Sequence, residues 1–274
     1  MPKRPMQRRQ QRRNLRTESE SVVRYLEDVG FVPRLVADDF WKKLLNDYGD
    51  LAHNFQALVD QRRTGEAGTA EYLAGVDTLY RLKNASLDFS VAITSQYFGR
   101  LYESYLAMVE SLGLDRRAKS VLDVGCDNGI LTSFYAKHFA KATVVGVDRC
   151  AEGLKCATDL AGRLNHPRPS YMHTDAFADV LHPNLTQCRW DIVFMTLCGY
   201  EQLDRQPDTH QAIAQRLFRY LSPGGTLVVM EYPSTELLAD LQMLARKDDT
   251  WTLTYEAFGG DAQQVLVSVL DTNR

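Results

Sequence analysis

The chain has 274 residues, of which 45% are hydrophobic and 24% charged, a composition typical of globular proteins. It contains no run of about 18 apolar residues, so we predict neither a membrane-spanning helix nor a membrane partner. Its five cysteines form no CxxC pair, which argues against a metal site and favours reduced thiols in a cytoplasmic protein.

The N-terminal segment is strongly basic. Residues 1–16 contain no acid, and because the whole chain carries a net charge of −3, the remaining residues carry −10. The basic residues of this segment are Lys3, Arg4, Arg8, Arg9, Arg12, Arg13 and Arg16. It has no apolar stretch typical of a secretory signal, and it lacks the serines of a transit peptide. We predict that residues 1–19 are disordered, either as a solvated arm or as one that binds RNA or protein.

Residues 20–115 are predicted to be helical throughout. Within residues 40–48, apolar side chains recur with the i, i+3, i+4, i+7 spacing of an amphipathic helix. Asp38 or Asp39 is expected to cap the start of this helix. Residues 62–68 contain two glycines and predict a loop.

Two further helices are predicted in this region. They cover Ala70–Asn84 and Ser90–Leu112, and Gly113 is expected to close the second one. One apolar stripe on the second helix is formed by Ile93, Tyr97, Leu101, Tyr105 and Met108. Residues 20–115 are therefore expected to form a helical cap next to the rest of the chain.

The pattern changes after Ala118, where short β-branched runs alternate with helical windows. This alternation predicts an α/β fold with a parallel, doubly wound sheet over residues 116–274. The expected strands are Ser120–Val124, Ala142–Val147, Ser170–Thr174, Trp190–Met195 and Thr226–Glu231. Two more runs, Thr250–Phe258 and Gln264–Leu270, are separated by two glycines and Asp261, which predicts a C-terminal antiparallel hairpin and seven strands in all.

A glycine loop follows the first predicted strand. Gly125 and Gly129 permit a tight turn and the close approach of a ligand to the backbone. The dinucleotide-binding fingerprint requires glycine at positions 127 and 130, which are occupied here by Asp127 and Ile130. The phosphate-binding Gly-Lys-Ser/Thr motif is not present either. A ligand without phosphates is therefore expected, and Asp123 at the end of the strand suits a cationic group.

Acids also end the next two predicted strands. Asp148 follows the second strand, 19 residues after Gly129, where a carboxylate can accept hydrogen bonds from both hydroxyls of a ribose. Asp175 follows the third strand and can accept a hydrogen bond from an adenine amino group. Ala176 and Phe177 are expected to contribute backbone or packing contacts beside it.

The sequence resembles the class I S-adenosylmethionine-dependent methyltransferases, which have a Rossmann-like core. The resemblance covers about residues 118–274 and rests on Asp123-x-Gly125-x-x-x-Gly129, Asp148, Asp175, Trp190–Val193 and Leu221–Leu227. It implies S-adenosylmethionine as the cofactor. The residues expected to contact the cofactor are Asp123, Gly125, Cys126, Asp127, Gly129, Asp148, Arg149, Asp175, Ala176, Phe177 and Thr196. The family's usual central glycine of the loop is replaced here by Asp127.

In this fold the methyl acceptor is expected beyond the end of the fourth strand. Glu201 is the first candidate for a general base, or else it is an acid that starts the following helix. Tyr200 could orient the acceptor, and Glu231 and Tyr232, at the end of the fifth strand, are a second choice. Tyr97, Phe98, Arg100 and Tyr102 lie in the helix ahead of the core, and one or two of them are expected to face the cofactor. Tyr97 is the one expected to contact the acceptor.

Three functions remain open from the sequence. The first is methyl transfer to an O, N or C nucleophile of a small molecule, which the acidic body and the helical cap favour. The second is methyl transfer to RNA or protein with the basic arm as an electrostatic contact. The third is a cofactor-binding module without transfer activity.

Overall fold

The structure is a computed structural model that describes residues 20–31, 34–64, 69–114, 117–178, 182–198, 210–231, 251–260 and 263–272. The predicted disordered arm and the predicted turn at Asp261 lie outside these ranges. Within them, no helix is both long and apolar enough to cross a membrane.

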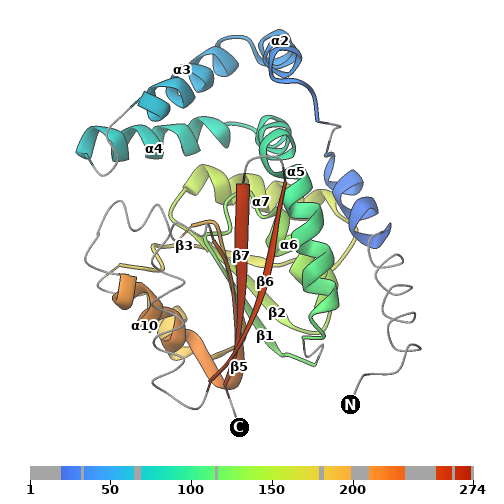
Figure 1. Cartoon of the computed structure of the whole chain (residues 1–274), viewed down its shortest axis with the longest axis vertical. Helices are drawn as coiled ribbons and strands as arrows, with labels where there is room; N and C mark the ends of the chain where they lie inside the picture. The colour runs from blue at the N-terminus through green and yellow to red at the C-terminus, as the bar shows by residue number, and fades with distance from the viewer. Residues whose placement is uncertain are drawn as a thin grey trace.

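Helices occupy the first part of the chain, as predicted. Residues 20–29 are helical, followed by α2 (Ala37–Tyr48), α3 (Asp50–Thr64), α4 (Ala70–Lys83) and α5 (Leu87–Ser111). In Figure 1, α2, α3 and α4 lie together at one end of the molecule, beyond the sheet.

Three predicted helix boundaries were wrong. Helix α2 starts after Val36, so Asp38 and Asp39 lie in its first turn rather than at its cap, where their charges favour the helix dipole. Helix α5 starts three residues early because the Ser86 hydroxyl accepts a hydrogen bond from the Phe89 amide at 3.3 Å. Helix α3 continues to Thr64, three residues into the predicted loop.

A seven-stranded sheet forms the centre of the molecule. Its strands are β1 (Ser120–Val124), β2 (Thr143–Asp148), β3 (Ser170–His173), β4 (Trp190–Thr196), β5 (Leu221–Glu231), β6 (Trp251–Gly260) and β7 (Gln263–Thr272). They lie in the order β3-β2-β1-β4-β5-β7-β6, with β7 antiparallel to both β5 and β6. The predicted α/β fold with a parallel sheet is confirmed for β1 to β5.

Helices connect the parallel strands. They are α6 (Ile130–His138), α7 (Ala151–Arg163), α8 (Pro183–Gln187) and α10 (His210–Tyr220). The predicted turn before β5 differs from the structure, because the strand already begins at Leu221. Trp190 pairs with Leu221 and Ile192 with Thr226, so the residues between them form an irregular bulge within the strand.

The apolar core has three parts, and α5 joins two of them. One cluster covers one face of the sheet and includes Tyr105 and Met108 of α5, while a second cluster covers the other face. A third cluster lies among α2 to α5 and includes Ile93. The single stripe predicted for α5 is therefore split, because this 25-residue helix packs on the sheet at one end and on helices at the other.

Candidate functional site

A cavity of about 290 Å³ lies at the carboxyl ends of β1 to β4. Ligands of open α/β sheets bind at this edge, where the strand order changes direction between β1 and β4. Helices α4 and α5 wall the cavity through Asp77, Tyr80, Phe98 and Tyr102. Ten predicted cofactor residues line it: Asp123, Gly125, Cys126, Asp127, Asp148, Arg149, Asp175, Ala176, Phe177 and Thr196.

The glycine loop after β1 folds back on β2. The amides of Gly125 and Cys126 both donate to the carbonyl of Val147, at 2.9 and 3.1 Å. Gly129 has a φ of 74°, and a methyl group there would lie 2.5 Å from Cβ of Ala157. Gly129 is not among the residues that line the cavity, so it packs the loop against α7 where a ligand contact was expected.

Asp148 ends β2 and organises the loops around it. Its carboxylate accepts hydrogen bonds from the amides of Asp127 and Cys150, both at 2.8 Å. Burial, followed by the negative charge of Asp127, raises the pKa of Asp148 to about 6. Each carboxylate oxygen can accept a second hydrogen bond, which leaves capacity for hydroxyl donors in the cavity.

Asp123 lies deeper, at the end of β1, and is 1% exposed. The hydroxyl of Thr132 donates to its carboxylate at 2.5 Å. Burial raises the pKa of Asp123 to about 7, the Thr132 hydrogen bond opposes this, and the charge of Asp148 adds to it. A cation in the cavity would lower that pKa again and favour the ionised form.

Asp123 should make folding stability depend on pH. Its folded pKa of about 7 exceeds the unfolded value, so the folded protein binds more protons between about pH 4 and 7. The stability that this group contributes is complete below about pH 4 and is lost as pH rises through 7. Urea unfolding should show that the wild type loses about 4 kcal/mol of stability relative to Asp123→Asn between pH 4 and pH 8. Parallel curves for the two proteins would contradict this; Asp159→Asn, at an exposed acid of α7, is the control.

The segment after β3 has the predicted acid and packing residues. The amide of Phe177 donates to the Asp175 carboxylate at 2.7 Å, and the hydroxyl of Tyr220 donates to the carbonyl of Ala176 at 2.6 Å. The side chains of Ala176 and Phe177 are buried. They form a fixed apolar wall on which a flat ring could pack.

Two predicted cofactor residues form ion pairs with α4. Asp127 pairs with Lys83, and Arg149 pairs with Asp77 at 3.0 Å. The sequence analysis did not select Lys83 or Asp77. The one signal for such a partner was the acid at position 127, because a carboxylate in a glycine loop requires a cation or donors nearby.

The acceptor side of the cavity differs in part from the prediction. Thr196 lines the cavity and donates to the Tyr105 hydroxyl at 3.3 Å. Tyr97 was expected there, but its side chain is 39% exposed and its ring lies 6.1 Å from that of Phe40. Two other candidates on this helix, Phe98 and Tyr102, line the cavity, with stacked rings 6.0 Å apart.

Of the remaining predicted acceptor residues, only Glu231 belongs to the part of the chain that the structure describes. Glu231 is fully buried at the end of β5 and is not among the residues that line the cavity. Tyr200, Glu201 and Tyr232 lie outside the described residues. No group of three or more candidate metal ligands occurs among the residues that the structure describes.

The family of proteins described as "Methyltransferase domain" matches residues 121–225. This part of the chain is therefore similar to a methyltransferase domain. The match includes the glycine loop and the acids after β1, β2 and β3, and the resemblance noted in the sequence is confirmed. Among curated proteins, none matches the chain.

Solved structures with a similar fold include three methyltransferases. Magnesium protoporphyrin IX methyltransferase from Synechocystis PCC 6803, with bound S-adenosylmethionine, is 14% identical, with a TM-score of 0.49 over 87% of this chain and 100% of that one. The N-methyltransferase NodS from Bradyrhizobium japonicum WM9 is 15% identical, with a TM-score of 0.49 over 66% of this chain and 99% of that one. An rRNA methylase from Streptococcus thermophilus is 17% identical, with a TM-score of 0.42 over 57% of this chain and 88% of that one.

The matched methyltransferase domain leaves out the helices that precede it. Residues of α4 and α5, which wall the cavity, lie before residue 121. The contacts that these helices make with the glycine loop therefore lie outside the part of the chain that the family pattern covers.

Proposed function

We propose that this protein is an S-adenosylmethionine-dependent methyltransferase that acts on a small-molecule acceptor. The observation that carries the proposal is the convergence of three acids, Asp123, Asp148 and Asp175, on one cavity at the carboxyl edge of the sheet. The wall that α4 and α5 add to this cavity supports a small acceptor.

The side chains around the cavity fit this cofactor. S-adenosylmethionine has no phosphate, and the acids after β1, β2 and β3 would repel one. In the proposal Asp148 accepts hydrogen bonds from the ribose hydroxyls, Asp123 faces the cationic end, and Asp175 accepts from the adenine amino group, with Phe177 packed beside the ring. When bound, the cofactor supplies an activated methyl group.

The protein's own part in the reaction is then alignment and the exclusion of water. Phe98 and Tyr102 present stacked rings to the cavity from α5, a surface that suits a largely apolar acceptor. The acidic body of the chain disfavours a long phosphate backbone as the acceptor. The five cysteines are free thiols, as we expect for a cytoplasmic protein.

The basic arm supports a second candidate, methyl transfer to RNA or protein. A transfer assay with labelled methyl groups separates the candidates, with metabolite pools, RNA and protein extracts offered in turn. We expect label in the metabolite fraction. Label in RNA or protein alone would contradict the small-molecule proposal, and cofactor binding without transfer to any fraction would indicate a binding module.

Asp148→Ala should weaken the binding of S-adenosylmethionine. Losing the charged acceptor for the ribose hydroxyls is expected to cost about 1.5–3 kcal/mol, which is roughly tenfold or more in Kd. Calorimetry measures this directly. Asp159→Ala, at an exposed acid of α7, is the matched control and should bind as the wild type does. Equal affinity of Asp148→Ala and wild type would refute the site assignment.

Deletion of residues 1–16 tests the role of the arm. The truncated protein should keep its unfolding midpoint, its cofactor affinity and its activity on a small acceptor, because the arm is predicted to be disordered. Assays at about 50 and 200 mM salt would reveal phosphate contacts, which weaken steeply over this range. A large, salt-dependent loss of activity on deletion would favour the RNA or protein candidate instead.

A further inference from the structure

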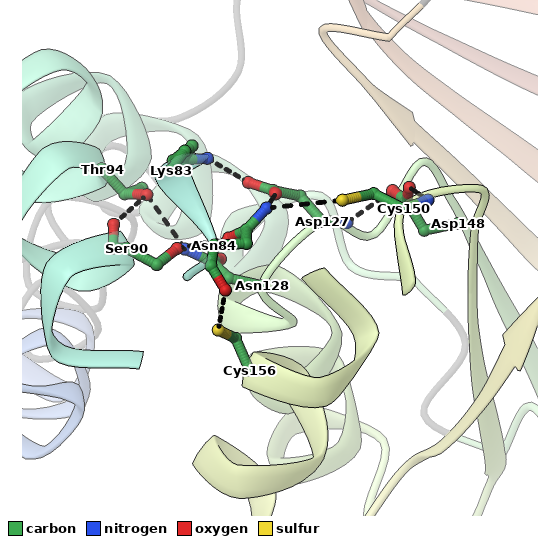
Figure 2. Close-up of polar contacts among 9 residues, drawn as sticks. All are labelled: Lys83, Asn84, Ser90, Thr94, Asp127, Asn128, Asp148, Cys150 and Cys156. Carbon is green, nitrogen blue, oxygen red and sulfur yellow. Dashed lines mark hydrogen bonds and ion pairs between the residues drawn. The ribbon is translucent and has the colours of Figure 1, made fainter. Parts of the chain in front are cut away.

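A chain of buried polar contacts joins the helical region to the glycine loop (Figure 2). Lys83 and Asn84 end α4, Ser90 and Thr94 lie on the first turns of α5, and Asp127 and Asn128 belong to the loop after β1. The four helical residues lie more than 30 positions before the two loop residues, so only the docking of the helices on the loop brings the two groups together.

Asp127 is held from the helical side by two groups. The Lys83 ammonium forms an ion pair with one carboxylate oxygen, and the Asn84 amide donates to the other at 2.8 Å. The side chains of Lys83 and Asp127 are only 9% and 19% exposed. Asp127 has a φ of 46°, a left-handed conformation that residues other than glycine rarely adopt. Its partners therefore stabilise a loop shape that the sequence alone disfavours.

Asn128 completes the contact. Its side-chain amide donates to the hydroxyls of Ser90 at 2.8 Å and Thr94 at 3.0 Å. Ser90 in turn donates to the Asn84 side chain at 2.6 Å. Asn84, Ser90, Thr94 and Asn128 are all buried, so undocking the helices would leave these polar groups without their partners.

The same chain of contacts reaches the acid of the proposed cofactor site. The amide of Asp127 donates to the Asp148 carboxylate at 2.8 Å. The position of Asp127, fixed by Lys83 and Asn84, therefore fixes one hydrogen bond of Asp148 and the distance between the two carboxylates. A second ion pair, between Asp77 of α4 and Arg149, joins the same helix to the residue after Asp148.

We propose that Lys83 and Asn84 are positioning residues: through Asp127 they hold Asp148 in place for the cofactor, so that binding requires the helical region to be docked. This inference rests on the proposed function. It adds that the segment ahead of the methyltransferase domain controls the cofactor site as well as the acceptor side.

Electrostatics predicts a readout that a purely structural role would not produce. The charged and titratable groups around Asp148 are Asp123, Cys126, Asp127, Arg149, Cys150 and, through Asp127, Lys83. Burial, followed by the negative charge of Asp127, raises the pKa of Asp148 to about 6. Removing the Lys83 charge should raise that pKa further, and removing the Asp127 charge should lower it.

The test compares wild type, Lys83→Met, Asp127→Asn and the double variant. Asparagine keeps the shape, accepts the Asn84 hydrogen bond and tolerates a positive φ. The measurements are the Kd of S-adenosylmethionine between pH 5 and 8 and the unfolding midpoint without cofactor. At pH 7.5 each single variant should bind about tenfold more weakly, because one buried charge has lost its partner. In the double variant, the Kd should increase by less than the product of the two single increases.

The affinity for S-adenosylmethionine should rise with pH as Asp148 ionises. The midpoint of this rise should lie at higher pH in Lys83→Met and at lower pH in Asp127→Asn than in the wild type. Lys43→Met, which breaks an exposed ion pair with Asp47 in α2, is the control and should change neither quantity. Two results would overturn the proposal, even if the variants unfold at lower midpoints. One is a loss of affinity in the double variant that equals the product of the two single losses, and the other is a pH dependence of Kd that is the same in all variants. Failure of the wild type to bind S-adenosylmethionine would instead refute the proposed function.

Discussion

Glu201→Gln should lower the rate of methyl transfer by about 10²–10⁴-fold and leave cofactor affinity unchanged. Glu201 lies outside the described residues, but it follows the end of β4 in the sequence, where Thr196, Leu197 and Cys198 line the cavity. Glutamine keeps the shape and hydrogen bonding of the side chain but cannot take a proton from the acceptor. The loss should shrink at high pH, where the acceptor ionises unaided.

Single-turnover rates distinguish the proposed general base from an acid that merely starts a helix. In the second case Glu201→Gln would cost a few tenths of a kcal/mol in stability and the rate would barely change. Glu71→Gln is the matched control, because Glu71 is an exposed acid in the first turn of α4. Weaker acceptor binding at an unchanged maximal rate would show that Glu201 recognises the acceptor without taking its proton.

Gly129→Ala should destabilise the protein by about 3–5 kcal/mol. The added methyl group would lie 2.5 Å from Cβ of Ala157 and 2.7 Å from the hydroxyl of Tyr171, and the φ of 74° is strained for alanine. Ala157 is buried in α7 and cannot withdraw without moving that helix from the sheet. Urea unfolding measures the loss.

Gly162→Ala is the control for this substitution. Gly162 lies in α7, and a methyl group there would meet nothing within 4 Å. Alanine should stabilise this site by about 0.5–1 kcal/mol, because glycine is a poor helix former. A Gly129→Ala protein as stable as the wild type would mean that the loop and α7 are less tightly packed than the structure shows.

The sequence by itself determined the parallel sheet and the acids at its edge. Short apolar runs followed by turns are local signals, and the carboxyl ends of parallel strands meet at one edge whatever the rest of the chain does. Asp123, Asp148 and Asp175 were therefore predictable from their positions at the carboxyl ends of the first three strands, and the structure places all three around one cavity.

Only the tertiary structure decided how each loop residue is used. Gly129 was expected beside the ligand but packs against Ala157, because its contact depends on how close α7 lies. The apolar face of α5 was predicted from periodicity, yet which side chains reach the cavity depends on its partners. Tyr97 faces Phe40, and Phe98 and Tyr102 line the cavity.

No pattern in the sequence predicts the ion pairs that α4 forms. Lys83 and Asp127 are separated by 44 positions, and Arg149 lies still farther from Asp77. No local periodicity relates such residues, and the chain offers 32 basic residues as possible partners for each acid. The choice among them is made by the docking of the helical region on the glycine loop, where buried polar groups are stable only with their partners in place.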